Sequence, residues 1–144
     1  MRKLLEKTTT NNKTKDYKNL NSTLAAWLPP VIWAGVIFAF SSLPQVSISQ
    51  FILWDFLAKK AAHLSEYAIL YVLIFRACRG RWAPSYFLLA AFALSDELHQ
   101  KFVPGRTSSP LDIGFDLIGA SIASYIIWKL GQIRRKTQKK SLKN

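Results

Sequence analysis

The chain has 144 residues, half of them apolar, and carries a net charge of +12. A chain of this length predicts one domain. In a soluble protein such a charge would favour nucleic acid as a partner, but no basic stripe interleaves with aromatic residues on any one element, so we expect no nucleic-acid binding. Lys and Arg instead gather in the tails and in the short gaps between apolar runs, a pattern typical of membrane topology signals.

Four apolar runs follow one another along the chain. The first carries Pro29 and Pro30 early, which fits a helix start or a kink near one end. Each run is about 14–20 residues long, at the short end of what crosses a hydrocarbon core of ~30 Å. The sequence therefore predicts an all-α fold, a four-helix transmembrane bundle with short loops and basic tails. The runs cover residues 24–40, 56–75, 82–95 and 113–128.

The segments outside this membrane domain, 24–130, are polar and basic. Residues 1–23 and 131–144 are predicted to be disordered cytoplasmic tails. Residues 1–23, the gap at 76–81 and the end of the chain from Lys129 onward hold 16 Lys and Arg residues, whereas the other side of the membrane would hold four. This asymmetry predicts a multi-pass protein of the cytoplasmic membrane with both termini in the cytoplasm.

Ionisable residues interrupt the runs near their non-cytoplasmic ends. A helical rise of ~1.5 Å per residue places Glu66, His63, Asp116 and Asp96 roughly 14–21 Å from the cytoplasmic ends of their runs. Charges at that depth cost a few kcal/mol each unless they face the bundle interior and find partners. We therefore expect at least four members of one set to share a pocket open to the outer leaflet. The set is His63, Asp96, Glu97, Arg106, Asp112 and Asp116.

Helical spacing supports a shared face for these groups. On three runs polar residues recur at intervals of three, four or seven positions. Gly119 and Ala123 also form a small-xxx-small pair, which predicts close approach of a neighbouring helix. The recurring polar residues are Lys60, His63 and Tyr67, then Asp96, His99 and Gln100, then Asp112 and Asp116.

Two interpretations of this cluster stay open. In the structural one, Glu66 and Asp116 are ion-pair partners of Lys60 and Arg106, and Tyr67 is a packing residue. In the functional one, the groups form a site for which we expect no cofactor or metal, since no strong metal-ligand motif is present. A divalent metal bound by His63, Glu66, Asp96, Glu97 or His99 stays an alternative. The candidate catalytic residues are then His63, Asp96, Glu97 and Asp116. The candidate substrate- or anion-binding residues are Lys60, Arg106, Gln100, Asp112, Glu66, Tyr67 and His99.

Three motifs resemble the VanZ-like family. They are the segment from Lys60 to Leu70, the block Asp96-Glu97-Leu-His99-Gln100 followed by Pro104-Gly105-Arg106, and Ser109 with Asp112, Asp116 and Gly119-Ala120. Ser41-Ser42-Leu43-Pro44 matches that family's early marker, and the resemblance covers residues 24–130 in order. Asp116 departs from the family pattern, in which many members carry Asn.

The resemblance implies a fold and a location more firmly than a reaction. The family is named for a protein that lowers susceptibility to teicoplanin, a glycopeptide, so it implies an envelope protein that binds or acts on membrane lipids or a lipid-linked cell-wall intermediate. An enzyme acting on a lipid-borne phosphate or acyl group is the alternative, with His63 as general acid or base and Ser41, Ser42 or Ser109 as candidate nucleophiles. Proton or ion translocation is a third. The oligomeric state is left open.

Overall fold

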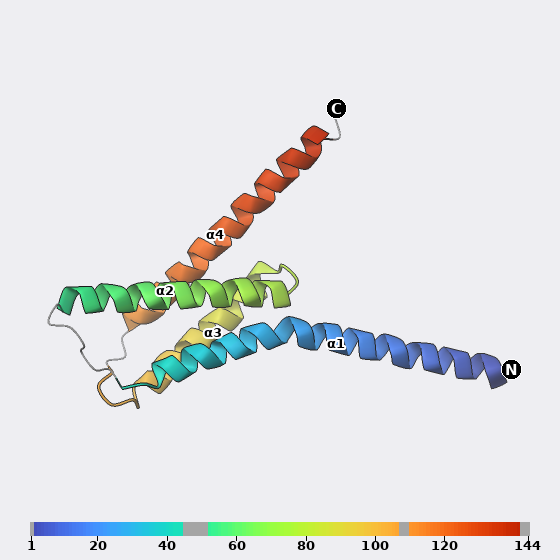
Figure 1. Ribbon diagram of the computed structural model, residues 1–144, viewed down its shortest axis with the longest axis horizontal. Coiled ribbons are helices and arrows are strands. Elements are labelled where there is room, and N and C mark those ends of the chain that lie inside the picture. The colour runs from blue at the N-terminus through green and yellow to red at the C-terminus, as the bar shows by residue number, and fades with distance from the viewer. Residues whose placement is uncertain (1, 45–51, 107–109, 142–144) are drawn as a thin grey trace.

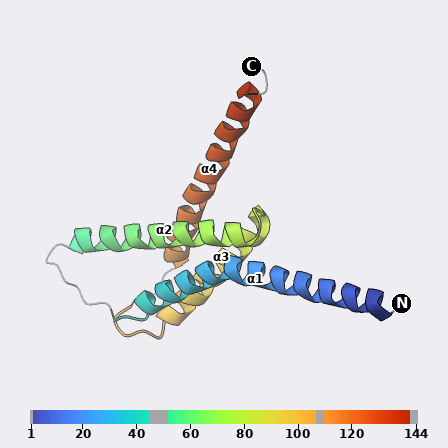
Figure 2. The ribbon, with the colours of Figure 1, turned by 45° about the vertical axis from the view of Figure 1, so that its right-hand side comes forward.

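The computed structural model describes the backbone of residues 2–44, 52–106 and 110–141, and side chains within 22–44, 57–106 and 111–141. The prediction of an all-α fold is confirmed over these ranges, where the regular elements are four helices. α2 packs against each of the other three, most extensively against α4 (Figures 1 and 2). The helices are α1 (Arg2–Ser41), α2 (Ile52–Ala77), α3 (Trp82–Gln100) and α4 (Pro110–Ser141).

The described residues of both basic tails continue α1 and α4 as helix, whereas the sequence predicts disordered tails. α1 extends back to Arg2 and α4 extends forward to Ser141. The physical reason is local, because neither residues 2–23 nor residues 132–141 contain Gly or Pro, the two strongest helix breakers. The N-terminal part of α1 and the C-terminal part of α4 project away from the bundle as two arms (Figures 1 and 2).

α1 passes through its two prolines instead of starting at them. Pro29 and Pro30 lie inside the helix. Each lacks the N–H that would bond to the carbonyl four residues earlier, which weakens the helix at Ala25 and Ala26. α1 bends near its middle in Figure 1, as a proline kink would make it do.

Two of the described segments are long and apolar enough to cross a membrane, Ser22–Ser41 of α1 and Leu111–Ser141 of α4. α2 and α3 hold most of the ionisable residues that interrupt the apolar runs, such as Lys60 and Glu66 on α2 and Asp96 on α3. The same residues that mark a candidate site therefore also lower the apolar character of these two helices.

Aromatic packing joins α2 and α3 near the turn that connects them. We call this the Gly80 end of the bundle. Arg79 and Gly80 take the left-handed conformation there, with φ of 56° and 76°. The rings of Phe75 and Trp82 are 4.5 Å apart, and those of Tyr71 and Tyr86 are 4.8 Å apart.

The opposite end of the bundle, which we call the Arg106 end, contains the end of α1, the first half of α2, the end of α3 and the start of α4. α2 and α4 cross closely here. A side chain at Gly119 would collide with the backbone of Leu64, and Ala120 and Ala123 are buried beside it. The predicted close approach at the small residues of α4 is confirmed, and it holds the polar residues of α2 and α4 at one level.

Candidate functional site

Asp96 is a buried carboxylate that connects three helices. It is 1% exposed. Ser41 of α1 donates a hydrogen bond to its Oδ1 at 2.5 Å, while Gln100 of α3 and Tyr67 of α2 donate to its Oδ2 at 2.9 and 3.4 Å. A buried carboxylate needs such donors because its desolvation is costly. Asp96 therefore fixes the end of α1 against α2 and α3.

His63 and Asp116 form a second polar contact, between α2 and α4. His63 Nδ1 lies 3.3 Å from Asp116 Oδ1, and Asp116 is 2% exposed. A carboxylate that accepts from Nδ1 orients the imidazole ring and leaves Nε2 for another partner. His63 is half-buried, so this contact directs one ring nitrogen away from α4.

Lys60 and Asp112 pair one turn further along the same two helices. Lys60 Nζ donates to Asp112 Oδ1, and both side chains are about one-fifth exposed. The ammonium group also lies 5.0 Å from the centre of the Phe115 ring. Asp112 is in the first turn of α4, where the helix dipole favours a negative charge. This pair ties α2 to the beginning of α4.

Arg106 reaches from the segment after α3 to the end of α1. Its Nη2 donates to the carbonyl of Phe40 at 2.8 Å and its Nε donates to that of Leu43 at 3.3 Å. A helix C-terminus leaves carbonyls without intrahelical partners and carries partial negative charge, so a guanidinium is well suited to it. The two bonds hold the Arg106 side chain in one orientation.

His99 belongs to a smaller contact with α1. Its Nε2 is 3.0 Å from Ser42 Oγ, and its ring stacks on Phe38 with 4.2 Å between centroids. The Ser42 hydroxyl also donates to the Phe38 carbonyl at 2.6 Å. Because that bond uses the hydroxyl proton, Ser42 is not arranged as a nucleophile with His99 as its base.

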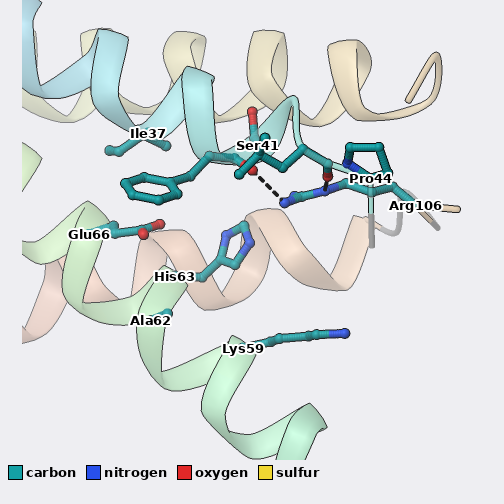
Figure 3. A pocket seen from close by; sticks show the side chains of 10 residues that line it. Ile37, Ser41, Pro44, Lys59, Ala62, His63, Glu66 and Arg106 are labelled. Atoms are coloured by element: carbon teal, nitrogen blue, oxygen red, sulfur yellow. Dashed lines mark hydrogen bonds between the residues drawn. The ribbon is translucent and has the colours of Figure 1, made fainter. Parts of the chain in front are cut away.

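A pocket of about 400 Å³ opens between α1, α2 and Arg106. Figure 3 shows the Arg106 guanidinium and the His63 ring on opposite sides of it, pointing toward one another, with Glu66 beside them and Lys59 at the edge. The remaining wall is mostly apolar and comes from the end of α1, the residues just after it and Ala62 of α2. The lining residues are Ile37, Phe40, Ser41, Leu43, Pro44, Lys59, Ala62, His63, Glu66 and Arg106.

The pocket is lined by fewer of the expected residues than the sequence predicts. Of the six residues expected to share a pocket, only His63 and Arg106 line this one, so the prediction of four is wrong for it. Asp96, Glu97 and Asp116 are buried, and two of them turn toward donors on neighbouring helices. A carboxylate gains more from such donors than from an open cavity. Among the candidate binding residues, Lys60, Tyr67, His99, Gln100 and Asp112 likewise contact other protein groups instead of lining the pocket.

The ion pairs expected in the structural interpretation are wrong. Lys60 pairs with Asp112, not with Glu66 or Asp116, and Asp116 pairs with His63. Arg106 bonds to backbone carbonyls. The pocket also contains Lys59, which the sequence did not select, although its position one turn before His63 on the same helix face was a usable signal.

Ser41 and Ser42 have structural partners that explain their place at the end of the first run. Ser41 lines the pocket, but its hydroxyl donates to Asp96 and is not bonded to His63. Ser109, the third candidate nucleophile, lies outside the described residues. Within the described ranges, no three His, Cys, Asp or Glu side chains are grouped as metal ligands.

The helices and the polar contacts at the Arg106 end define a class: an all-helical membrane protein whose buried ionisable residues converge at one end. The VanZ/LLP1 family model matches residues 5–132. The chain belongs to the VanZ/LLP1 family, as the motifs in its sequence predicted. No curated protein and no solved structure matches it.

Proposed function

We propose that this protein binds the anionic headgroup of a lipid-linked cell-envelope component in the pocket beside Arg106. The observation that carries the proposal is the way Arg106 is held. Two of its five N–H donors are bonded to backbone carbonyls, of Phe40 in α1 and of Leu43 just after it, and three remain for a ligand among the described contacts. A guanidinium fixed in this way suits bidentate binding of phosphate or carboxylate.

The other charges around the pocket favour the same ligand. Lys59 adds a second positive charge and Glu66 one negative charge, so the lining is net positive even with His63 neutral. Glu66 and neutral His63 would accept hydrogen bonds from hydroxyl groups of a ligand. A phosphate or carboxylate carried by a polyhydroxylated group would therefore fit this pocket better than an anion alone.

The proposal places the pocket at the outer leaflet. With four membrane-crossing helices, the excess of Lys and Arg in the tails and at 76–81 would put those segments in the cytoplasm. Arg106 would then face the opposite side, where lipid-linked cell-wall intermediates meet glycopeptides. In a cell, the protein would lower susceptibility to teicoplanin-type glycopeptides by changing the presentation of such an intermediate.

The test compares Arg106→Gln with Lys101→Gln, a matched change at an exposed residue outside the pocket. Both proteins would be reconstituted in phosphatidylcholine nanodiscs and titrated with butyl phosphate. We expect Arg106→Gln to weaken binding at least tenfold and Lys101→Gln to leave it unchanged. Equal affinity of both variants and the wild type would refute the proposal.

A cellular test uses the same two variants. Expressed at equal membrane levels, Lys101→Gln should keep any protection against teicoplanin that the wild type gives, and Arg106→Gln should lose it. Reporter fusions within residues 104–106 should locate this segment outside the cytoplasm. A cytoplasmic location would contradict the outer-leaflet assignment.

One observation favours a second function, an enzyme that acts on a lipid-borne phosphate or acyl group. His63 lines the pocket while buried Asp116 holds its Nδ1, the arrangement of a histidine prepared for general acid–base catalysis. Arg106 would stabilise the developing negative charge across the pocket. Turnover of a lipid phosphate by the wild type, lost in His63→Ala and kept in Ser65→Ala on an exposed face of α2, would support it. Binding without turnover would support the first function.

A further inference from the structure

A second, apolar cavity, which we call the groove, lies on the same face of α1 as the pocket. It has a volume of about 130 Å³ and is lined on α1 by Trp27, Pro30 and Ala34, among others. Ile37 and Ser41 line the pocket. These five residues follow one another at intervals of three and four positions, so they form one stripe along the helix. The groove and the pocket are therefore successive parts of one α1 surface.

α2 shows the same continuity. His63 and Glu66 line the pocket, while Leu70 and Ile74 line the groove. These residues also follow at intervals of three and four positions and form one stripe. On each of the two helices the centres of the two cavities are about ten residues apart, which corresponds to about 15 Å along a helix. The pocket and the groove thus occupy two depths of one seam between α1 and α2.

The groove differs from the pocket in chemistry. None of its lining residues is charged, and Phe92 of α3 closes part of it. Ala34 contributes only a methyl group to the lining, and Val31, which also lines the groove, is 63% exposed, so the groove opens toward the surroundings of the bundle. Between the groove and the pocket, Trp33 Nε1 donates to the Glu66 carbonyl at 3.0 Å and holds α1 against α2.

We propose that the groove binds a hydrocarbon chain of the same ligand whose anionic headgroup occupies the Arg106 pocket. The inference rests on the proposed function and narrows its ligand to a single amphiphile that runs along the α1–α2 seam. A charged end at Arg106 and an apolar end about 15 Å deeper match a lipid phosphate lying along its own acyl or prenyl chain. Burial of each methylene in the groove would strengthen binding, so chain length should control affinity.

The experiment compares dodecyl phosphate with butyl phosphate on protein in phosphatidylcholine nanodiscs. Ala34→Phe fills the groove, and Ala91→Phe makes the same change at an exposed residue of α3. Dodecyl phosphate also partitions into the nanodisc bilayer, but to the same extent with both variants, so a difference between their affinities reports binding to the protein. We expect Ala34→Phe to weaken dodecyl phosphate binding at least tenfold relative to Ala91→Phe, with butyl phosphate affinity equal in both.

The outcomes separate this inference from the proposed function. If Arg106→Gln weakens both ligands while Ala34→Phe weakens neither, the pocket binds anions and the groove inference is overturned. If Arg106→Gln weakens neither ligand, the proposed function itself fails.

A second variant and a second measurement guard against misfolding of Ala34→Phe. Val31→Trp would cover the groove from its exposed edge and should reduce dodecyl phosphate binding in the same selective way. A diazirine near the end of the dodecyl chain should label Leu70, Ile74 or Phe92 in the wild type and lose that labelling in Arg106→Gln. Labelling that is equal in the wild type and Arg106→Gln would mean that bulk lipid fills the groove, and would overturn the inference.

Discussion

At the Gly80 end, α2 and α3 are joined by a tight turn and by aromatic rings, whereas at the Arg106 end all four helices are joined by side chains that carry charge or hydrogen-bonding groups. The Phe75–Trp82 and Tyr71–Tyr86 contacts are typical of the first region. The Ser41–Asp96 and His63–Asp116 contacts are typical of the second. Both regions belong to the same helices, so the difference lies in side-chain chemistry.

This difference indicates what the polar residues are for. Aromatic pairs contribute about 0.5–1.5 kcal/mol each beyond their burial, and they join the helices without any desolvated charge. Buried carboxylates such as Asp96 and Asp116 lose the free energy of hydration, and their hydrogen-bond partners compensate for this loss without a large net gain in stability. Aromatic packing and the turn join α2 and α3 at the Gly80 end without an ionised side chain, so helices of this chain can pack without buried charge. The ionisable residues at the Arg106 end make contacts between helices, and their gathering at that one end is also an argument for the ligand binding proposed above.

The largest effect is expected where α2 and α4 cross, at the level of the polar contacts. Gly119→Val would place a branched side chain against the Leu64 backbone, which has no rotamer to move away. We expect a loss of about 3 kcal/mol or more in unfolding free energy, at the upper part of the range for overpacking. Gly114→Val is the control, because nothing lies within 4 Å of its Cβ position. Unfolding of both variants in mild detergent would compare them, and equal stability would contradict the close crossing.

The next effect concerns the Asp96 contacts. Asp96→Ala would leave Ser41, Tyr67 and Gln100 without their acceptor, at a cost of about 2–3 kcal/mol in unfolding free energy. Ser95→Ala, at the exposed neighbouring position, should cost little. Asp96→Asn should lie between them, since it keeps one acceptor oxygen. If Asp96→Ala is as stable as Ser95→Ala in the same unfolding assay, Asp96 does not hold the end of α1.

The sequence predicted the helices and the end of the bundle at which polar residues gather. Both follow from local information, because hydrophobic runs and a periodicity of three or four residues are enough to place side chains on one face. The Gly119–Ala123 pair also predicted a close helix contact without any knowledge of the partner. What remained open was the partner itself, which proved to be α2 at Leu64.

Individual pairings could not be predicted, for a geometric reason. The sequence positions of Glu66, Asp112 and Asp116 make each of them a possible partner of Lys60. The position of α2 along α4 determines which acid Lys60 contacts, and the sequence does not specify that position. Arg106 depends on where α1 ends, since its partners are carbonyls that no sequence pattern marks as ligands. The pocket prediction failed for the same reason, because buried acids turn toward whichever donors the packing supplies.

A smaller effect tests the turn at the Gly80 end. Gly80 has a φ of 76°, and a Cβ at this position would lie an ordinary 3.7 Å from the Phe75 ring, so only backbone conformation disfavours Ala. Gly80→Ala should lower the unfolding free energy by about 1–2 kcal/mol. Gly131→Ala, with nothing nearby inside α4, should instead raise it by about 0.5–1 kcal/mol. Chemical unfolding of both would show whether the turn needs glycine, and a stabilising Gly80→Ala would contradict the observed φ.

The smallest expected effect is the coupling energy of the Lys60–Asp112 ion pair, which measures how much such a polar contact stabilises the Arg106 end. A double-mutant cycle with Lys60→Met and Asp112→Ala isolates their coupling, because the cycle cancels the Phe115 contact and the favourable position of Asp112 at the start of α4. Both side chains are partly exposed, so we expect about 0.5–1 kcal/mol of coupling in unfolding free energy. A coupling above about 2 kcal/mol, more than an aromatic pair adds beyond its burial, would mean that such ion pairs are a main cause of stability at this end. The contrast between the two ends would then reflect two ways of joining helices, and the charges would no longer argue for a ligand.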